Sequence, residues 1–186
     1  MKKKVVVYLG DSTHKKSPLE QVLTKMKLPY QMLHDSDLHQ LCGYLMDLDG
    51  FEVRTVQEEV HFASDLMLLH NISDEEIMEM NKLLQEQGIV MKRKAMLTEH
   101  NQHWILGDLM KEIEQEHRYF QYREEILALL QASSELIIDS YTKESWKTYE
   151  EAFYRAYDAL QKETSLEDIQ QVYEMLVEAK ESLIKR

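Results

Sequence analysis

The segment KAMLTEHNQHW, residues 94–104, joins a short apolar strand to a polar turn and then to the start of a helix. The same order occurs three times earlier in the chain, after apolar runs that end at Leu9, Leu33 and Leu69. Repeated alternation of strands and helices favours parallel strands, because each helix carries the chain back to the same edge of the sheet. The sequence therefore predicts an α/β domain over residues 1–118, with helices and a small, mainly parallel four-stranded sheet.

Two helix starts in the first part of the chain carry a capping pattern, and Ser165 with Asp168 is a weaker one before the last helix. Ser17 precedes Glu20 by three residues, which predicts a helix capped by Ser17 with Glu20 completing a capping box. Ser73 and Glu76 have the same spacing and predict a second capped helix. Residues 50–64 fit neither the strand period nor the helix period, so we assign no element to them.

The strand pattern stops near residue 118, and apolar residues then recur every three or four positions in three stretches. These stretches are residues 126–137, 146–160 and 169–183. Such a stripe forms the buried face of a helix, and helices of this length need one another for stability. We therefore expect residues 119–186 to form an antiparallel three-helix bundle.

The second stretch is preceded by YTKESW, residues 141–146, and the third by SLED, residues 165–168. Together with the alanines between them, these segments resemble the FIVAR three-helix repeat of bacterial surface proteins, over about residues 124–186. The resemblance implies a three-helix fold. FIVAR modules usually belong to secreted or wall-attached proteins and bind sugars or host proteins. The resemblance therefore also implies carbohydrate or surface-protein binding by the bundle, a role that would require export.

The block Lys94-Ala95-x-x-Thr98-x-x-Asn101-x-x-Trp104 resembles a second family, a short bacterial one of unknown function. This resemblance covers about residues 65–118. It supports the order of strand and then helix, and it implies no activity.

Charge and cysteine content restrict the classes of partner. The net charge is −12, and residues 1–118 and 119–186 each carry six more acidic than basic side chains, which disfavours a nucleic-acid surface. Cys42 is the only cysteine, which excludes an internal disulfide and a multi-thiolate zinc site. No apolar run approaches a membrane span or a signal-peptide core. We expect a cytoplasmic chain with a protein partner, no nucleic acid and no membrane; the oligomeric state stays open.

Five histidines, at positions 14, 34, 70, 100 and 103, fall at the predicted strand ends. If all four strands are parallel, these ends meet at the sheet edge where α/β proteins bind ligands. Imidazole groups bind divalent transition metals such as zinc, manganese or iron. The pattern therefore makes His34, His70, His100 and His103 the candidate metal ligands. The alternative is that polar residues here only cap helices and fill turns.

A second set of candidate ligand-binding residues comprises Asp11, His14, Thr98 and Asn101. Asn101 is placed to accept from the N–H of Trp104, and Thr98 to close the corner after the strand. The free N–H groups at such a helix start can bind phosphate or carboxylate. Asp11 and His14 lie in the equivalent turn after the first strand, which lacks the glycine and lysine spacing of a P-loop.

No serine lies in a Gly-x-Ser-x-Gly elbow and no His-Glu-x-x-His element occurs, so the sequence contains no assembled catalytic set. We therefore expect a non-enzymatic cytoplasmic interaction or ligand-binding module. The first alternative is a metal- or anion-dependent enzyme with its site at the strand ends. The second alternative is carbohydrate or surface-protein binding through the helical bundle.

Overall fold

A computed structural model describes residues 2–56 and 60–186. The chain divides into two compact units, Met1–Lys111 and Glu112–Arg186. Helix α4 (Leu106–Ala132) begins in the first unit and continues into the second, so the boundary expected after residue 118 falls inside this helix. Among the described residues, no helix has both the length and the apolar character needed to cross a membrane.

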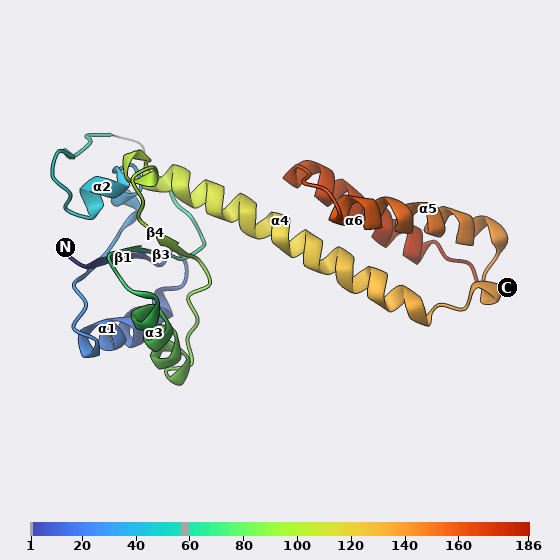
Figure 1. Ribbon diagram of the computed structural model, residues 1–186, viewed down its shortest axis with the longest axis horizontal. Helices are drawn as coiled ribbons and strands as arrows, with labels where there is room; N and C mark the ends of the chain where they lie inside the picture. The colour runs from blue at the N-terminus through green and yellow to red at the C-terminus, as the bar shows by residue number, and fades with distance from the viewer. Residues whose placement is uncertain (1, 57–59) are drawn as a thin grey trace. The chain divides into compact units, whose positions relative to one another are not determined.

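The first unit contains the expected four-stranded sheet, in the order β2-β1-β3-β4 (Figure 1). Its strands are β1 (Lys4–Tyr8), β2 (Tyr30–Met32), β3 (Leu66–His70) and β4 (Lys94–Met96). The β1–β2 and β3–β4 pairs are parallel, whereas the central β1–β3 pair is antiparallel. The sheet is therefore mixed, and the expected parallel pairing is found in the two outer pairs but not in the central pair.

The connections explain this difference in direction. Helix α1 (Lys16–Lys25) joins β1 to β2, and α3 (Asp74–Glu86) joins β3 to β4, so each parallel pair has its crossover helix. Between β2 and β3 the helical elements are only the 3-10 turn η2 (Asp35–Asp37) and the four-residue α2 (Cys42–Leu45). The described residues from 46 to 65 contain no helix or strand, and the chain enters β3 at the same edge of the sheet at which β2 ends, so β3 runs antiparallel to β1.

Both faces of the sheet are covered, by α1 and α3 on one side and by α2 and the first turns of α4 on the other (Figure 1). The α1–α3 side forms one core, in which Val5 and Val7 of β1 cluster with Leu19, Leu23 and Met80. The central strands are buried throughout except at the end of β3, which is why their sequences are continuous apolar runs.

The predicted helix starts have opposite outcomes. Ser73 caps α3, with its hydroxyl accepting from Glu76 N and the Glu76 carboxylate accepting from Ser73 N, as predicted. Helix α1 instead begins at Lys16, directly after the 3-10 turn η1 (Thr13–Lys15), and has no side-chain cap. The predicted Ser17 cap is wrong because the chain is already helical at that residue.

The second unit contains the rest of α4 together with α5 (Lys143–Leu160) and α6 (Leu166–Glu181). Two 3-10 turns, η4 (Ser133–Glu135) and η5 (Ile138–Ser140), separate α4 from α5. Ile126, Tyr149 and Ile169, one from each helix, are buried in a single apolar cluster. All three helices therefore share one core, in agreement with the expected helical unit.

Contacts along the helices show that neighbours in sequence run in opposite directions. Arg123 of α4 donates to the Leu160 carbonyl at the end of α5, at 2.7 Å, whereas Ser133, directly after α4, bonds Tyr149 near the start of α5. Ile184, after α6, donates to Ser145 at the start of α5. The described contacts thus join opposite ends of α4 and α5, and of α5 and α6.

Candidate ligand-binding site

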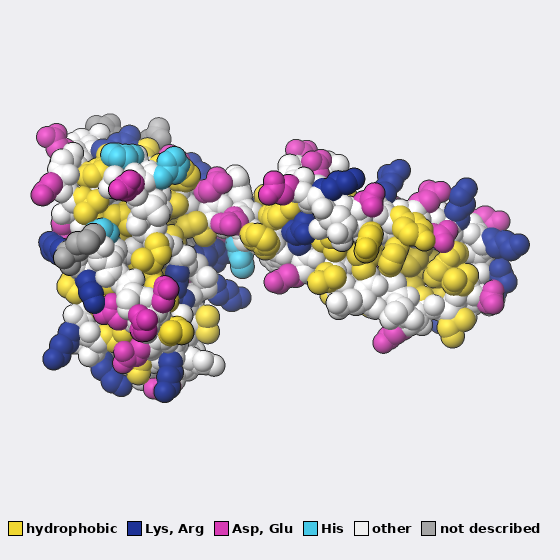
Figure 2. All heavy atoms as spheres, in the orientation of Figure 1, with side chains coloured by type: hydrophobic (Ala, Val, Ile, Leu, Met, Phe, Trp, Pro, Cys, Tyr) yellow, Lys and Arg dark blue, Asp and Glu magenta, His cyan; other side chains and the backbone are white. Residues whose placement is uncertain are grey.

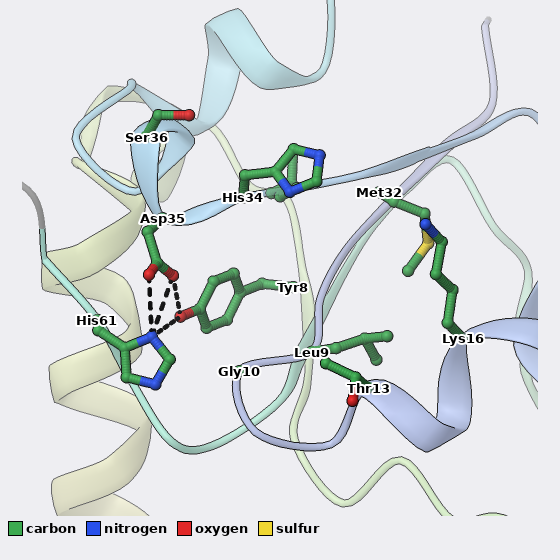
Figure 3. A pocket seen from close by; sticks show the side chains of 11 residues that line it. Tyr8, Leu9, Gly10, Thr13, Lys16, Met32, His34, Asp35, Ser36 and His61 are labelled. Atoms are coloured by element: carbon green, nitrogen blue, oxygen red, sulfur yellow. Dashed lines mark hydrogen bonds and ion pairs between the residues drawn. The ribbon is translucent and has the colours of Figure 1, made fainter.

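A cavity of about 500 Å³ lies where the parallel strands β1 and β2 end (Figure 3). Val7 of β1 pairs with Met32 of β2, so the loops that follow both strands start at the same edge of the sheet. The carboxyl edge of parallel strands is the usual ligand site of α/β proteins. Eleven residues line the cavity, namely Tyr8, Leu9, Gly10, Thr13, Lys16, Met32, Leu33, His34, Asp35, Ser36 and His61.

Gly10 allows the backbone at residues 62 and 63 to pack directly against the turn after β1. Its φ is +51°, and a Cβ atom there would lie 2.3 Å from the Phe62 carbonyl oxygen and 2.6 Å from that of Ala63. The next residue, Asp11, donates its backbone N–H to Ala63 O at 3.1 Å. Only glycine combines this backbone conformation with such a close approach.

Tyr8 is the last residue of β1, and its hydroxyl connects the sheet to both following loops. The Oη atom donates to Asp35 Oδ1 at 2.6 Å and accepts from Phe62 N at 3.2 Å. Burial, and then the hydrogen bond to Asp35, raise the pKa of Tyr8 to about 12. The hydrogen bond from Tyr8, followed by that from His61, lowers the pKa of the Asp35 carboxyl. The pair is therefore a neutral phenol donating to a carboxylate.

His61 lies between two carboxylates. Its Nδ1 is 3.0 Å from Asp35 Oδ2, and its Nε2 is 3.0 Å from Asp11 Oδ1. A carboxylate only accepts hydrogen bonds, so both contacts are satisfied together when both ring nitrogens carry a proton, as in an imidazolium. The bond to Asp35 first, and that to Asp11 second, raise the pKa of His61.

Cationic and polar groups lie on the other side of the cavity. Lys16, at the start of α1, extends toward Met32 on the side opposite His61 and Asp35 (Figure 3). Thr13 of η1 lies near the base of this wall, and His34 projects from the loop after β2. The cavity therefore has an acidic wall neutralised in part by His61 and a basic wall formed by Lys16.

Two of the predicted site residues lie at this cavity. His34 lines it, and Asp11 holds the outer nitrogen of His61. His14, in η1, is exposed and is not among the lining residues. The turn after β1 therefore takes part in the site through Asp11 and not through His14.

His70, Thr98 and Asn101 lie at the opposite edge, because β3 is antiparallel to β1 and His70 pairs with Lys4. Thr98 N donates to Asn101 Oδ1 at 2.8 Å, and Asn101 N donates to Thr98 Oγ1 at 3.1 Å. The predicted cap of Trp104 by the Asn101 side chain is wrong, since Trp104 N bonds the backbone oxygen of Asn101. Both N–H groups of this reciprocal turn are occupied.

The structure does not bring the four candidate metal ligands together. His34 follows β2 and His70 ends β3, at opposite edges of the sheet. The His100 ring meets Trp104, and the His103 ring meets Phe51, each with ring centroids 5.2 Å apart. Within residues 2–56 and 60–186, no three His, Cys, Asp or Glu side chains form a group that could hold a metal ion.

Sequence reasoning missed Tyr8, Lys16 and His61 as site residues. Tyr8 ends an apolar run and resembles any core residue, and Lys16 resembles a solvated surface charge. His61 lies in residues 50–64, where no period marks an element. Its partners Asp11 and Asp35 are distant in sequence, so no local pattern identifies this group.

A family model described as a domain of unknown function, DUF3783, matches residues 65–120. The match covers β3, α3, β4 and the first part of α4. All the residues lining the cavity lie before this segment. No curated protein and no solved structure matches the chain. The comparisons therefore indicate an uncharacterised family for one segment of the chain.

Proposed function

We propose that the first unit is a non-enzymatic module that binds a small polar molecule with an anionic group in the cavity beyond β1 and β2. The observation that carries this proposal is a cavity of about 500 Å³ at the carboxyl ends of two adjacent parallel strands, lined by charged and polar groups. Volumes of this size suit small ligands, and a few convergent polar groups fix their orientation.

The charge arrangement selects the ligand class. Lys16, with the Thr13 hydroxyl and the His34 imidazole, offers donors to a carboxylate or phosphate group of the ligand. Asp35 already accepts from Tyr8 and His61, so its charge is partly compensated. The anionic end of the ligand therefore faces Lys16, and its hydroxyl or amine groups face Asp35.

The hydrogen bonds of His61 favour binding over catalysis. A general base needs a ring nitrogen without a proton within reach of the substrate. Both nitrogens of His61 face carboxylates, and these hydrogen bonds raise its pKa, which favours the ring that carries both protons. In this arrangement His61 fixes the position of the loop and does not accept a proton.

An enzyme that binds an anionic substrate at this edge is the second candidate. The observation that favours it is the displaced pKa values of Tyr8, Asp35 and His61 in one cavity, since such values are frequent at active sites. In that case His61 would act as a general acid that donates a proton to the substrate. A metal-dependent version would take its divalent ion through ligands supplied jointly by the chain and the substrate.

The ligand class is tested by saturation-transfer NMR on the full chain. The probes are inorganic phosphate, glycerol phosphate and citrate, with glycerol as the neutral counterpart. Lys16→Ala should weaken binding of the anionic probes about tenfold, the loss of one charge-assisted hydrogen bond. Lys25→Ala, which removes an exposed lysine at the other end of the same helix, should leave binding unchanged. Equal binding of glycerol, or equal effects of both variants, would contradict the proposal.

We also propose that the second unit is FIVAR-like and that the chain is a cytoplasmic bacterial protein with a protein partner. The contacts of the YTKESW segment support the FIVAR assignment. Thr142 accepts from Ser145 N and caps α5, and the Tyr141 and Trp146 rings stack with centroids 6.0 Å apart. Ser165 caps α6 by accepting from Asp168 N at 3.0 Å. Thr142, Ser145, Ser165 and Asp168 of the two quoted segments thus have structural roles at helix starts.

A further inference from the structure

We propose that the groove between α4 and α5 of the second unit binds a cationic amphipathic helix of another protein. The groove has a volume of about 290 Å³, and aromatic side chains of α5 make up half of its lining residues. Its residues are Leu130, Ser133 and Ser134 from the α4 side and Trp146, Tyr149, Glu150, Phe153 and Tyr154 from α5. Figure 2 shows hydrophobic side chains gathered on this face of the second unit.

The apolar surface extends along α5 beyond the groove itself. Trp146, Phe153 and Tyr157 recur at helical spacing, and Tyr154 and Tyr157 are 62% and 53% exposed. On α4, Leu127 is 48% exposed, one turn before Leu130. Large apolar side chains exposed in a row indicate an interaction surface. The stripe from 146 to 157 is about 16 Å long, which matches a partner helix of about three turns.

The charge of the unit selects the occupant. Residues 112–186 carry 17 acidic and 9 basic side chains, and Glu150 lies in the groove lining. A second copy of this chain would bring the same excess of negative charge, which opposes self-association. A helix with apolar residues at i, i+3, i+4 and i+7 and with lysine or arginine on its flanks complements both the aromatic lining and the net negative charge of the unit.

The probe for this groove is a synthetic amphipathic helical peptide of leucine and lysine, about 14 residues long so that it covers the stripe. Binding to the full chain is measured by the fluorescence anisotropy of the labelled peptide, at about 0.15 M salt so that distant charges are screened. A leucine–glutamate peptide of the same pattern and a leucine–lysine peptide of scrambled order are the comparison probes. We expect the first peptide to bind at least tenfold more tightly than either comparison probe.

Two substitutions then locate the site. Glu150→Lys should weaken binding about tenfold, and Tyr154→Ser about fivefold, since both side chains line the groove and are exposed. Glu174→Lys makes the same change in net charge on the exposed surface of α6 and should change binding less than twofold. Circular dichroism of each variant confirms that the helices are retained.

Three results would overturn the proposal. If Glu174→Lys weakens binding as much as Glu150→Lys, the peptide responds only to bulk charge. If the scrambled peptide binds equally well, the groove does not recognise an amphipathic helix. If the chain sediments as a dimer that Tyr154→Ser dissociates, the occupant is a second copy of the chain.

Discussion

His61 connects three parts of the first unit through hydrogen bonds that depend on its charge. Asp35 follows β2, Asp11 follows β1, and His61 itself belongs to the connection before β3. The pKa of His61 is raised, so its stabilisation is complete below the pKa of the unfolded imidazole, about 6.5. It is lost as the pH rises through the higher pKa of the folded chain. The cluster therefore stabilises the fold at mildly acid pH and less at alkaline pH.

We expect the difference in melting temperature between the wild type and His61→Gln to depend on pH between pH 5 and pH 9. The wild type should exceed the variant at the acid end, and the difference should shrink as the pH rises from about 6.5 through the higher pKa of the folded chain, because the unfolded imidazole loses its proton first. His14→Gln removes an exposed histidine outside the cluster and serves as the control. A difference that grows with pH would contradict the assignment of an imidazolium.

Gly10 and Gly88 provide a matched pair for testing the close approach at the cavity. Both have positive φ, but a Cβ at Gly10 would meet backbone oxygens of Phe62 and Ala63, whereas nothing lies within 4 Å of one at Gly88. Gly88→Ala should cost only the backbone strain, about 1–2 kcal/mol. Gly10→Ala should cost clearly more, because the Phe62 segment must move. Urea unfolding measures both, and equal costs would show that the loop adapts freely.

The helix starts and strand positions were predictable because their determinants are local. Ser73 and Glu76 are three residues apart and bond each other, so the residues of the sequence pattern are the ones that make the cap. At Ser17 the same spacing failed, since the preceding 3-10 turn had already started the helix at Lys16. A capping pattern predicts a helix start only where the chain before it is extended.

Arg123 is an element-level contact that no sequence period reveals. It donates to the Leu160 carbonyl at 2.7 Å, where the last carbonyls of α5 lack helical partners, and its guanidinium lies over the Tyr119 ring. Arg123→Ala should destabilise the second unit by about 1–3 kcal/mol, because a charged donor is lost from partly buried carbonyls. Arg155→Ala removes an arginine of α5 that donates to the Met175 sulfur at 3.7 Å, and it should lower the stability of the unit by less than Arg123→Ala. Thermal unfolding followed at 222 nm compares the two, and an equal loss would contradict the capping role.

At the level of the whole chain, strand direction decided which predicted residues could meet. The apolar runs predicted four strands, but pairing between β1 and β3 joins residues about sixty positions apart, and no local pattern encodes its direction. One antiparallel pair moved His70, Thr98 and Asn101 to the edge opposite Asp11 and His34. Which of these turns share one edge of the sheet was therefore beyond the reach of sequence reasoning, although each turn had been located.

The two units have separate apolar cores, so we expect them to lose structure separately even though α4 belongs to both. Leu68 is fully buried in β3, and Leu176 is fully buried among the helices of the second unit. Substituting either leucine by alanine should cost about 2–5 kcal/mol within its own unit.

Hydrogen exchange followed by mass spectrometry reads the units independently, because each peptide reports its own opening. Leu68→Ala should accelerate exchange in β1 and β3 and leave α5 and α6 protected, and Leu176→Ala should do the reverse. Loss of protection in both units from either substitution would instead mean that α4 transmits unfolding and that the chain is one cooperative structure.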